Sequence, residues 1–395
     1  MSCTHRPAPA VRALGHTCAV RYHDRLMIVD LHTHIWESPD QLGKGAAQRV
    51  LRNAAQPWDR PDASSSAHDA AMEPVQHAVI LGFESQMLGG SISIEQVARY
   101  VARKPEKYFG FAGIDPLAGS VKSRIDHARS LGLVGVTISP AAQGFHPSHS
   151  RAQPLYEACS DRGMPLLVHG VTHLSSEARL EFAQPVLLDE VARDFPKLKI
   201  IISQVGHPWI EETLVLMSKH RNVFADLSNV VTRPWQLYGL LLSAHQQGVM
   251  DRLLFGSDFP FSTPQKAITT IYSVNTLTQG TMLPSVPREQ LRSIVERDVL
   301  EVLGLRRKTS EPVVEIAAVV AAPKPAPVIA APVVAVAASV LAAPIESTAP
   351  ASAAANDDGS TIVDPYDLDE RDGAAFKTEN AQSKSPDSAE KRPQG

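Results

Sequence analysis

The chain has 395 residues, a formal net charge of -4 and 44% hydrophobic residues, a composition typical of a soluble globular protein. A charge this close to zero argues against nucleic acid or an anionic membrane as a partner, because both require a strongly basic surface. Only three cysteines are present, Cys3, Cys18 and Cys159. They exclude a disulfide framework and a cysteine-based zinc site, and they favour a cytoplasmic location.

Residues 1–26 contain arginines and histidines but no apolar run as long as that of a signal peptide. We expect this N-terminal arm to be disordered, with neither a secretion signal nor a membrane-spanning helix. Met27 stands directly before the first long apolar run. A translation start at Met27 is therefore an alternative to a start at Met1.

Residues 27–307 contain eight short apolar runs, many of them rich in β-branched residues, that alternate with helical segments. This pattern is typical of parallel strands that are buried on both faces. The predicted strands are residues 28–32, 78–83, 108–114, 134–139, 166–169, 199–203, 223–227 and 253–256. The predicted helices are residues 94–103, 121–131, 154–162, 185–195, 209–220, 235–247, 267–279 and 288–303.

Eight strands that alternate with helices over about 280 residues predict an α/β fold, a (β/α)8 TIM barrel formed by residues 27–307. A doubly wound open sheet is the alternative. The first predicted strand is not followed by the glycine-rich phosphate loop typical of that fold, so we favour the barrel.

The chain changes character after the predicted barrel. Residues 308–350 are rich in Ala, Val and Pro, and prolines at this density exclude a continuous helix and favour an extended linker. Residues 351–395 are rich in Ser, Asp and Glu, which predicts a disordered acidic tail. The apolar part of the linker has a second interpretation, as a segment that docks on an unknown protein.

Five side chains that can take part in catalysis follow the predicted strands. His32 and His34 end the first strand, His169 ends the fifth, His207 follows the sixth and Asp258 follows the eighth. In a barrel these strand ends meet at one rim, where active sites form. His32 and His34 project to the same side of a strand, where two imidazoles can chelate one divalent cation. Taken singly, each residue also fits a structural role, as a buried histidine or a helix cap.

Four motifs carry a family resemblance, and they read Val-Asp-Leu-His-Thr-His, Pro-Leu-Leu-Val-His-Gly, Gly-His-Pro-Trp and Phe-Gly-Ser-Asp-Phe-Pro. In this order they resemble the amidohydrolase superfamily. The nearest branch is the amidohydrolase-related group that includes aminocarboxymuconate-semialdehyde decarboxylase-like proteins. The resemblance extends over about residues 28–305.

The resemblance implies a metal centre in which His32, His34, His169 and Asp258 bind one divalent metal ion. Zn2+ is the expected ion, because three nitrogens and one carboxylate oxygen suit zinc and leave a position for water. The family's chemistry further implies that the metal-bound water attacks a carbonyl or lactone carbon of a small molecule, with Asp258 as the general base.

Two positions depart from the pattern of the family. Gln204 stands at the end of the sixth strand, where relatives usually carry a catalytic histidine, and glutamine cannot exchange protons near neutral pH. Either Gln204 or His207 is therefore expected to polarise the substrate. Thr137 stands at the end of the fourth strand in place of the lysine of binuclear relatives, which favours a single metal ion.

A metal-dependent hydrolase is our leading hypothesis. The alternative is a non-oxidative decarboxylase of an aromatic or unsaturated carboxylic acid that uses the same ligands, and a third hypothesis is an inactive barrel that serves as a binding scaffold. The sequence leaves open whether the protein is a homodimer. Further candidates for the substrate pocket, each also consistent with an ordinary core or surface role, are Trp36, Glu84, His146, His173 and Arg233.

Overall fold

The computed structural model describes residues 27–52, 60–170 and 175–305. The predicted N-terminal arm, the linker, the acidic tail and His173 lie outside these residues. Within the part of the chain that is described, no helix has the length and apolar character needed to cross a lipid bilayer.

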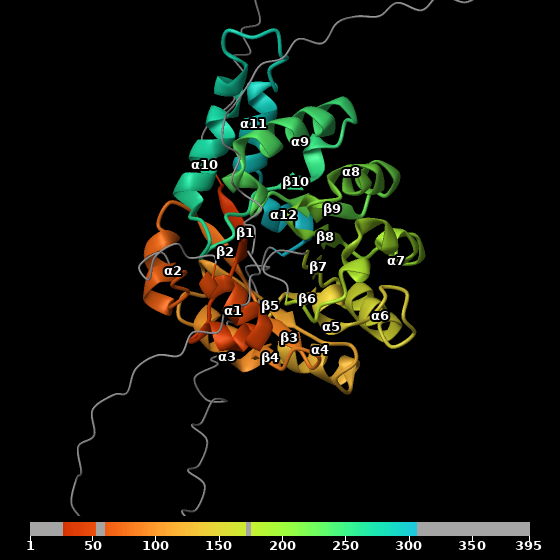
Figure 1. Cartoon of the computed structure of the whole chain (residues 1–395). Coiled ribbons are helices and arrows are strands. Elements are labelled where there is room, and N and C mark those ends of the chain that lie inside the picture. The colour runs from red at the N-terminus through yellow and green to blue at the C-terminus, as the bar shows by residue number, and fades with distance from the viewer. Residues whose placement is uncertain (1–26, 53–59, 171–174, 306–395) are drawn as a thin grey trace, which may run out of the picture. The chain divides into compact units, whose positions relative to one another are not determined.

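Eight parallel strands form a single sheet at the centre of the fold, with helices arranged around it (Figure 1). The strands are β1 (Val29–Thr33), β2 (His77–Leu81), β5 (Tyr108–Gly113), β6 (Gly135–Ile138), β7 (Leu166–Val168), β8 (Ile200–Ile202), β9 (Val223–Asp226) and β10 (Leu253–Leu254). Each pairs in parallel with the next strand of this series. All eight overlap the runs from which they were predicted.

The last strand returns to the first and nearly closes the barrel. The backbone N–H of Asp258, just beyond β10, donates to the carbonyl of His32 at 3.1 Å, and the N–H of His34 donates to the carbonyl of Phe259 at 2.9 Å. These bonds join the two ends of the sheet, and the predicted TIM barrel is confirmed.

Helices cover the outer face of the strands. They are α3 (Ile94–Val101), α4 (Val121–Ser130), α6 (Gln153–Arg162), α7 (Asp189–Asp194), α8 (Ile210–Lys219), α9 (Pro234–Gln246), α10 (Pro264–Ser273) and α11 (Arg288–Val295). The prediction of one helix over residues 288–303 is wrong, because a separate helix α12 (Val299–Leu303) follows α11. The Asp298 side chain accepts the backbone N–H of Glu301 at 3.0 Å, and this N-cap starts the new helix.

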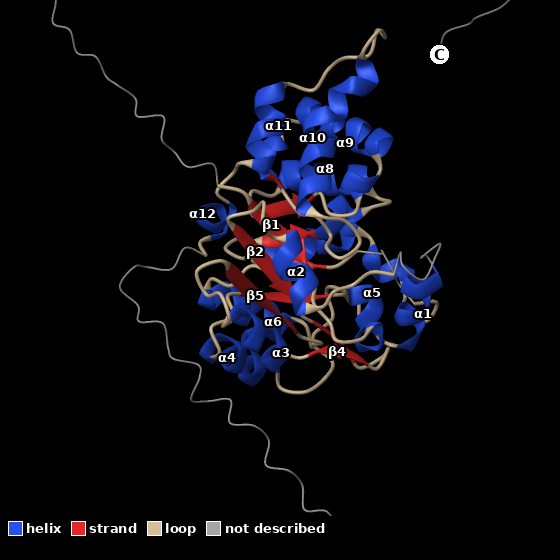
Figure 2. Cartoon of the chain, turned by 90° about the vertical axis from the view of Figure 1, so that its left-hand side faces the viewer, coloured by secondary structure: helices blue, strands red, loops and turns tan. Residues whose placement is uncertain are grey.

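Several short elements within the strand-to-helix connections were not predicted. They are α1 (Lys44–Arg52), α2 (Ser65–Ala71), the hairpin of β3 (Phe83–Ser85) and β4 (Gly90–Ile92), and α5 (Pro140–Gln143). Figure 2 shows α1 and α5 near one end of the strands and α12 near the other. Because α1 follows the carboxyl end of β1, the first of these ends is the rim where active sites form in barrels.

Two apolar clusters hold the barrel together. Inside it, residues such as Val79, Phe111 and Ile201 from separate strands pack with one another and with Leu300 of α12. Outside it, alternate strand residues such as Ile80 pack against the surrounding helices. Since α12 and the interior side chains fill one end of the barrel, polar groups gather at the opposite rim.

Candidate active site

A bulge in β1 brings two histidines to the rim. The pairing of β1 with β2 shifts register between Asp30 and Thr33, and such bulges re-aim side chains next to active sites. The Nε2 atoms of His32 and His34 lie 3.1 Å apart. Gly256 leaves the space that His32 occupies, because a Cβ atom at this glycine would lie only 2.9 Å from the Cβ of His32.

His169, directly after β7, completes a cluster of three histidines. One ring nitrogen of each of His32, His34 and His169 lies within 4.8 Å of the other two. The Nε2 atom of His169 is buried and has no hydrogen-bond partner among the described residues. Such a buried orphan is costly unless a further group binds it. Burial also lowers the pKa of His169 to about 3, which keeps the ring neutral, as a metal ligand must be.

These residues fit a divalent cation. Two nitrogens bound tetrahedrally to one zinc ion lie about 3.3 Å apart. The 3.1 Å between the Nε2 atoms of His32 and His34 is close to this value. The orphaned nitrogen of His169 supplies a third donor, and a set of imidazoles with a nearby carboxylate suits transition metals.

Asp258 provides that carboxylate. Its Oδ1 atom lies 3.6 Å from Nε2 of His32, and Asn229 donates to its Oδ2 atom at 3.4 Å. The side chain is buried, and burial raises its pKa above the ordinary value. Its backbone has a φ of 65°, in the left-handed region that non-glycine residues adopt only when their surroundings impose it. The hydrogen bond from its own N–H to His32 is one such constraint.

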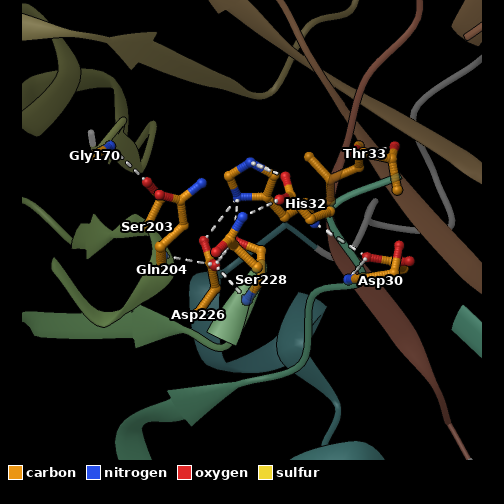
Figure 3. A network of polar contacts seen from close by, with 12 residues as sticks. Asp30, His32, Thr33, Gly170, Ser203, Gln204, Asp226 and Ser228 are labelled. Atoms are coloured by element: carbon orange, nitrogen blue, oxygen red, sulfur yellow. Dashed lines mark hydrogen bonds and ion pairs between the residues drawn. The ribbon is translucent and has the colours of Figure 1, made fainter. Parts of the chain in front are cut away.

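Asp226, at the end of β9, was not singled out from the sequence. The Nδ1–H of His32 donates to its Oδ2 atom at 3.0 Å, and Ser228 and the N–H of Gln204 donate to its Oδ1 atom (Figure 3). Burial alone would raise the pKa of Asp226, but the charge of His32 and these hydrogen bonds hold the pKa below its ordinary value. The bond to Asp226 fixes a proton on Nδ1 of His32, so Nε2 is the nitrogen that faces the cluster.

The structure separates the two residues considered for the sixth strand. Gln204 is buried, adopts a φ of 57° in the turn after β8, and lines the cavity beside the histidines. His207 is not among the described residues that line this cavity. Its Nε2 atom accepts a hydrogen bond from Arg233 at 2.5 Å, and burial together with the Arg233 charge lowers its pKa.

A cavity opens at the histidine cluster. Its described lining consists of His32, His34, Trp36, Leu42, Ala46, Phe83, Leu88, Ser139, Ala142, His169, Gly170, Ser175, Gln204, Asp258 and Phe261. Beyond the histidines and Asp258, the walls are mainly aliphatic and aromatic, and no lysine or arginine occurs in this described set. Trp36, a candidate for the substrate pocket, belongs to this lining and also packs in the outer apolar cluster.

Of the other candidates for the substrate pocket, Glu84, His146 and Arg233 lie outside this lining, and His173 is not among the described residues. The carboxylate of Glu84 forms an ion pair with Arg124, and His146 packs edge-on against Phe182 with ring centroids 5.9 Å apart. Neither these residues nor Arg233 belongs to the described lining of the cavity.

The family model described as Amidohydrolase matches residues 29–296 of this chain. The match covers more than half of the sequence and includes every residue of the histidine cluster. The chain belongs to the amidohydrolase family. Members of this family are enzymes, hydrolases and decarboxylases among them, and they bind a divalent metal ion. A search of curated proteins finds no significant match to this amidohydrolase.

Solved structures share its fold. An uncharacterised TIM-barrel protein from Bordetella bronchiseptica is 19% identical with a TM-score of 0.54, over 71% of this chain and 99% of that one. The 5-carboxyvanillate decarboxylase from Sphingomonas paucimobilis is 14% identical with a TM-score of 0.52, over 71% and 100%. A probable 2-pyrone-4,6-dicarboxylic acid hydrolase from Acinetobacter baumannii is 14% identical with a TM-score of 0.47, over 70% and 99%. At these identities the likeness to the first two structures shows the fold alone.

Proposed function

We propose that this amidohydrolase is a metal-dependent hydrolase of a small molecule. One divalent ion, with zinc as the expected ion, is held by His32, His34 and His169, with Asp258 beside them. The observation that supports this most directly is the convergence of three imidazole nitrogens within 4.8 Å at the base of the rim cavity, next to a buried carboxylate.

Each residue has a separate task in this proposal. A bound divalent ion acidifies water and polarises a carbonyl oxygen. Asp258 lies 3.6 Å from His32 and is placed to take a proton from the attacking water and pass it to the leaving group. Gln204 lines the same cavity, and its neutral carboxamide can donate a hydrogen bond to the substrate oxygen as negative charge develops.

The walls of the cavity support a substrate with an uncharged, apolar body. Trp36, Phe83 and Phe261 face a cavity whose described lining contains no cationic side chain. A lactone, ester or amide with an aromatic or aliphatic body suits such walls, because the polar centre can reach the histidine cluster while the body displaces water.

Decarboxylation of an aromatic acid is the second candidate function, and the aromatic walls at Trp36 and Phe261 favour it. The same ligands would hold a divalent ion that binds the carboxylate of the substrate. Asp258 would deliver the proton to the carbon that loses carbon dioxide. Gln204 weighs against this candidate, because a glutamine cannot supply the additional proton transfer of the histidine that relatives usually carry at this position.

Metal analysis and Asp258→Asn test the proposal. We expect about one equivalent of zinc or a similar ion in the purified protein. The variant should retain the ion but lose turnover about 10²- to 10⁴-fold, because it lacks the proton carrier. Asp161→Asn, an exposed change on α6, is the matched control and should leave turnover unchanged. Hydrolysis is measured on panels of lactones, esters and amides. Decarboxylation is measured on aromatic acids by detection of carbon dioxide.

Two results would contradict the hydrolase. Full turnover by metal-free protein would remove the metal mechanism, and carbon dioxide release without any hydrolysis would establish the decarboxylase instead. Metal-loaded protein that turns over neither panel would favour a binding scaffold.

A further inference from the structure

A buried chain of hydrogen bonds lies behind the strand that carries the two histidines. His68, from α2, is fully buried, and its Nε2 atom lies 2.9 Å from the hydroxyl of Thr33. Its Nδ1 atom lies 2.7 Å from the hydroxyl of Tyr100 on α3. Thr33 stands in the sequence between His32 and His34, so this chain ends directly on the segment that holds the ligands.

The partners fix the tautomer of His68. The hydroxyl of Thr33 donates its only hydrogen to the carbonyl of Val79 at 2.7 Å. It must therefore accept from Nε2–H of His68, which leaves a lone pair on Nδ1. The one hydroxyl hydrogen of Tyr100 has two acceptors within reach, this Nδ1 atom at 2.7 Å and Oδ1 of Asp69 at 3.0 Å. Burial lowers the pKa of His68 to about 3, so the ring is neutral and both of its nitrogens are satisfied.

The same imidazole also contacts the other side of the metal centre. Its ring packs edge-on against Phe259, with centroids 5.2 Å apart. Phe259 directly follows Asp258, and its carbonyl accepts the N–H of His34 at 2.9 Å. One side chain thus touches the residue between two histidine ligands and the residue next to the carboxylate.

This double contact lies at the seam between β10 and β1, where few backbone hydrogen bonds join the two strands. β10 has only two residues, and beyond it the seam with β1 consists of a few backbone hydrogen bonds and an isolated bridge between Thr33 and Phe259. We propose that His68 is a positioning residue for the metal centre. It holds Thr33 and Phe259 in register and so sets the spacing between the histidine ligands on one edge of the sheet and Asp258 on the other. The inference rests on the proposed metal-dependent function.

Three variants and one affinity measurement test it. His68→Phe keeps a ring between Tyr100 and Phe259 but removes both hydrogen bonds of the imidazole. Thr33→Val removes the acceptor of Nε2–H together with the hydrogen bond to the carbonyl of Val79. Each should weaken zinc binding about 10-fold or more, as measured by competition with a chromophoric chelator. His68→Gln should restore much of the affinity, because its amide nitrogen can take the place of Nε2–H.

A double-mutant cycle makes the test specific. If both substitutions act through one hydrogen bond, their effects should not add. The combined His68→Phe and Thr33→Val variant should then bind zinc no more weakly than the weaker-binding of the two single variants. His245→Phe, at an exposed site on α9, serves as the control and should leave zinc affinity unchanged. Unfolding in urea is measured on the same samples.

The outcomes separate this inference from the proposed function. Wild-type protein that binds no zinc would overturn both. Wild-type binding with undiminished zinc affinity in the folded His68→Phe and Thr33→Val variants would overturn the role of His68 alone, even if the variants unfold at lower urea. Should His68→Phe fail to fold, Thr33→Val decides the question by itself.

Discussion

At the scale of single residues, the partner of each imidazole determines which nitrogen is left for a ligand. Asp226 accepts the Nδ1–H of His32 at 3.0 Å, and Thr33 accepts the Nε2–H of His68 at 2.9 Å. The two rings therefore carry opposite tautomers although they lie on either side of the same strand. A histidine with Nε2 protonated would be unsuited to the position of His32, because its lone pair would face Asp226.

Asp226→Asn tests this control of the tautomer. The amide removes a buried negative charge and can donate to Nδ1 as well as accept from it, so His32 loses its fixed orientation. We expect zinc affinity to fall about 10- to 100-fold and kcat/KM to fall with it. Asp194→Asn, an exposed change on α7, is the control. Unchanged zinc affinity in the Asp226 variant would contradict the assignment.

The sequence could place the histidine cluster but not its support. The strand ends singled out His32, His34, His169, His207 and Asp258, because a barrel brings all strand ends to one rim. The family resemblance then selected four of them, without His207, as metal ligands. Asp226 also ends a buried run, but its role depends on pairing with a residue 194 positions earlier, which no local pattern encodes. The sequence signal that could have identified Asp226 was an acidic residue at the end of a buried strand.

At the scale of elements, the strands were predictable and the connections were not. Long apolar runs identify strands because burial on both faces leaves no polar alternation. Helices such as α2 are too short to show a hydrophobic period, and the bulge in β1 adds a single residue without any change in composition. Ser64 is the one local signal for α2, because its hydroxyl accepts the N–H of Ala67 at 3.3 Å.

Ser64→Ala should therefore weaken α2. Loss of this N-cap is expected to lower the free energy of unfolding by about 1 kcal/mol, measured by urea denaturation. Because α2 carries His68, zinc affinity should also decrease, though less than in His68→Phe. Ser65→Ala, at the exposed neighbouring position, should change neither quantity. Equal stability of the two variants would show that the cap contributes nothing.

At the scale of the whole molecule, the buried His68 makes the barrel sensitive to acid. Its folded pKa is about 3, whereas the unfolded side chain titrates near 6.5, so below this pH the unfolded chain binds a proton that the folded protein excludes. The contribution of the neutral His68 ring to the free energy of unfolding is therefore fully present above about pH 6.5. It is lost as the pH falls from there towards 3. The titratable groups facing the ring include Tyr100, Tyr108, Asp69, Lys104 and Lys107.

His68→Gln should remove the part of the pH dependence of the free energy of unfolding that comes from protonation of His68. Between about pH 6.0 and pH 4.5, the metal-free wild type should lose about 2 kcal/mol more unfolding free energy than the variant does. Urea denaturation with excess chelator measures both proteins at the two pH values. Parallel losses in the two proteins would mean that His68 is already charged in the folded state.

The closure of β10 on β1 has a consequence for biosynthesis. His32 is translated 226 residues before Asp258. A nascent chain thus contains His32, His34 and His169 before Asp258 and the final strand, which hold them in place, have been synthesised. Tight retention of the ion would then require a completed barrel, so a polypeptide that stalls before β10 would release its metal to competing chelators.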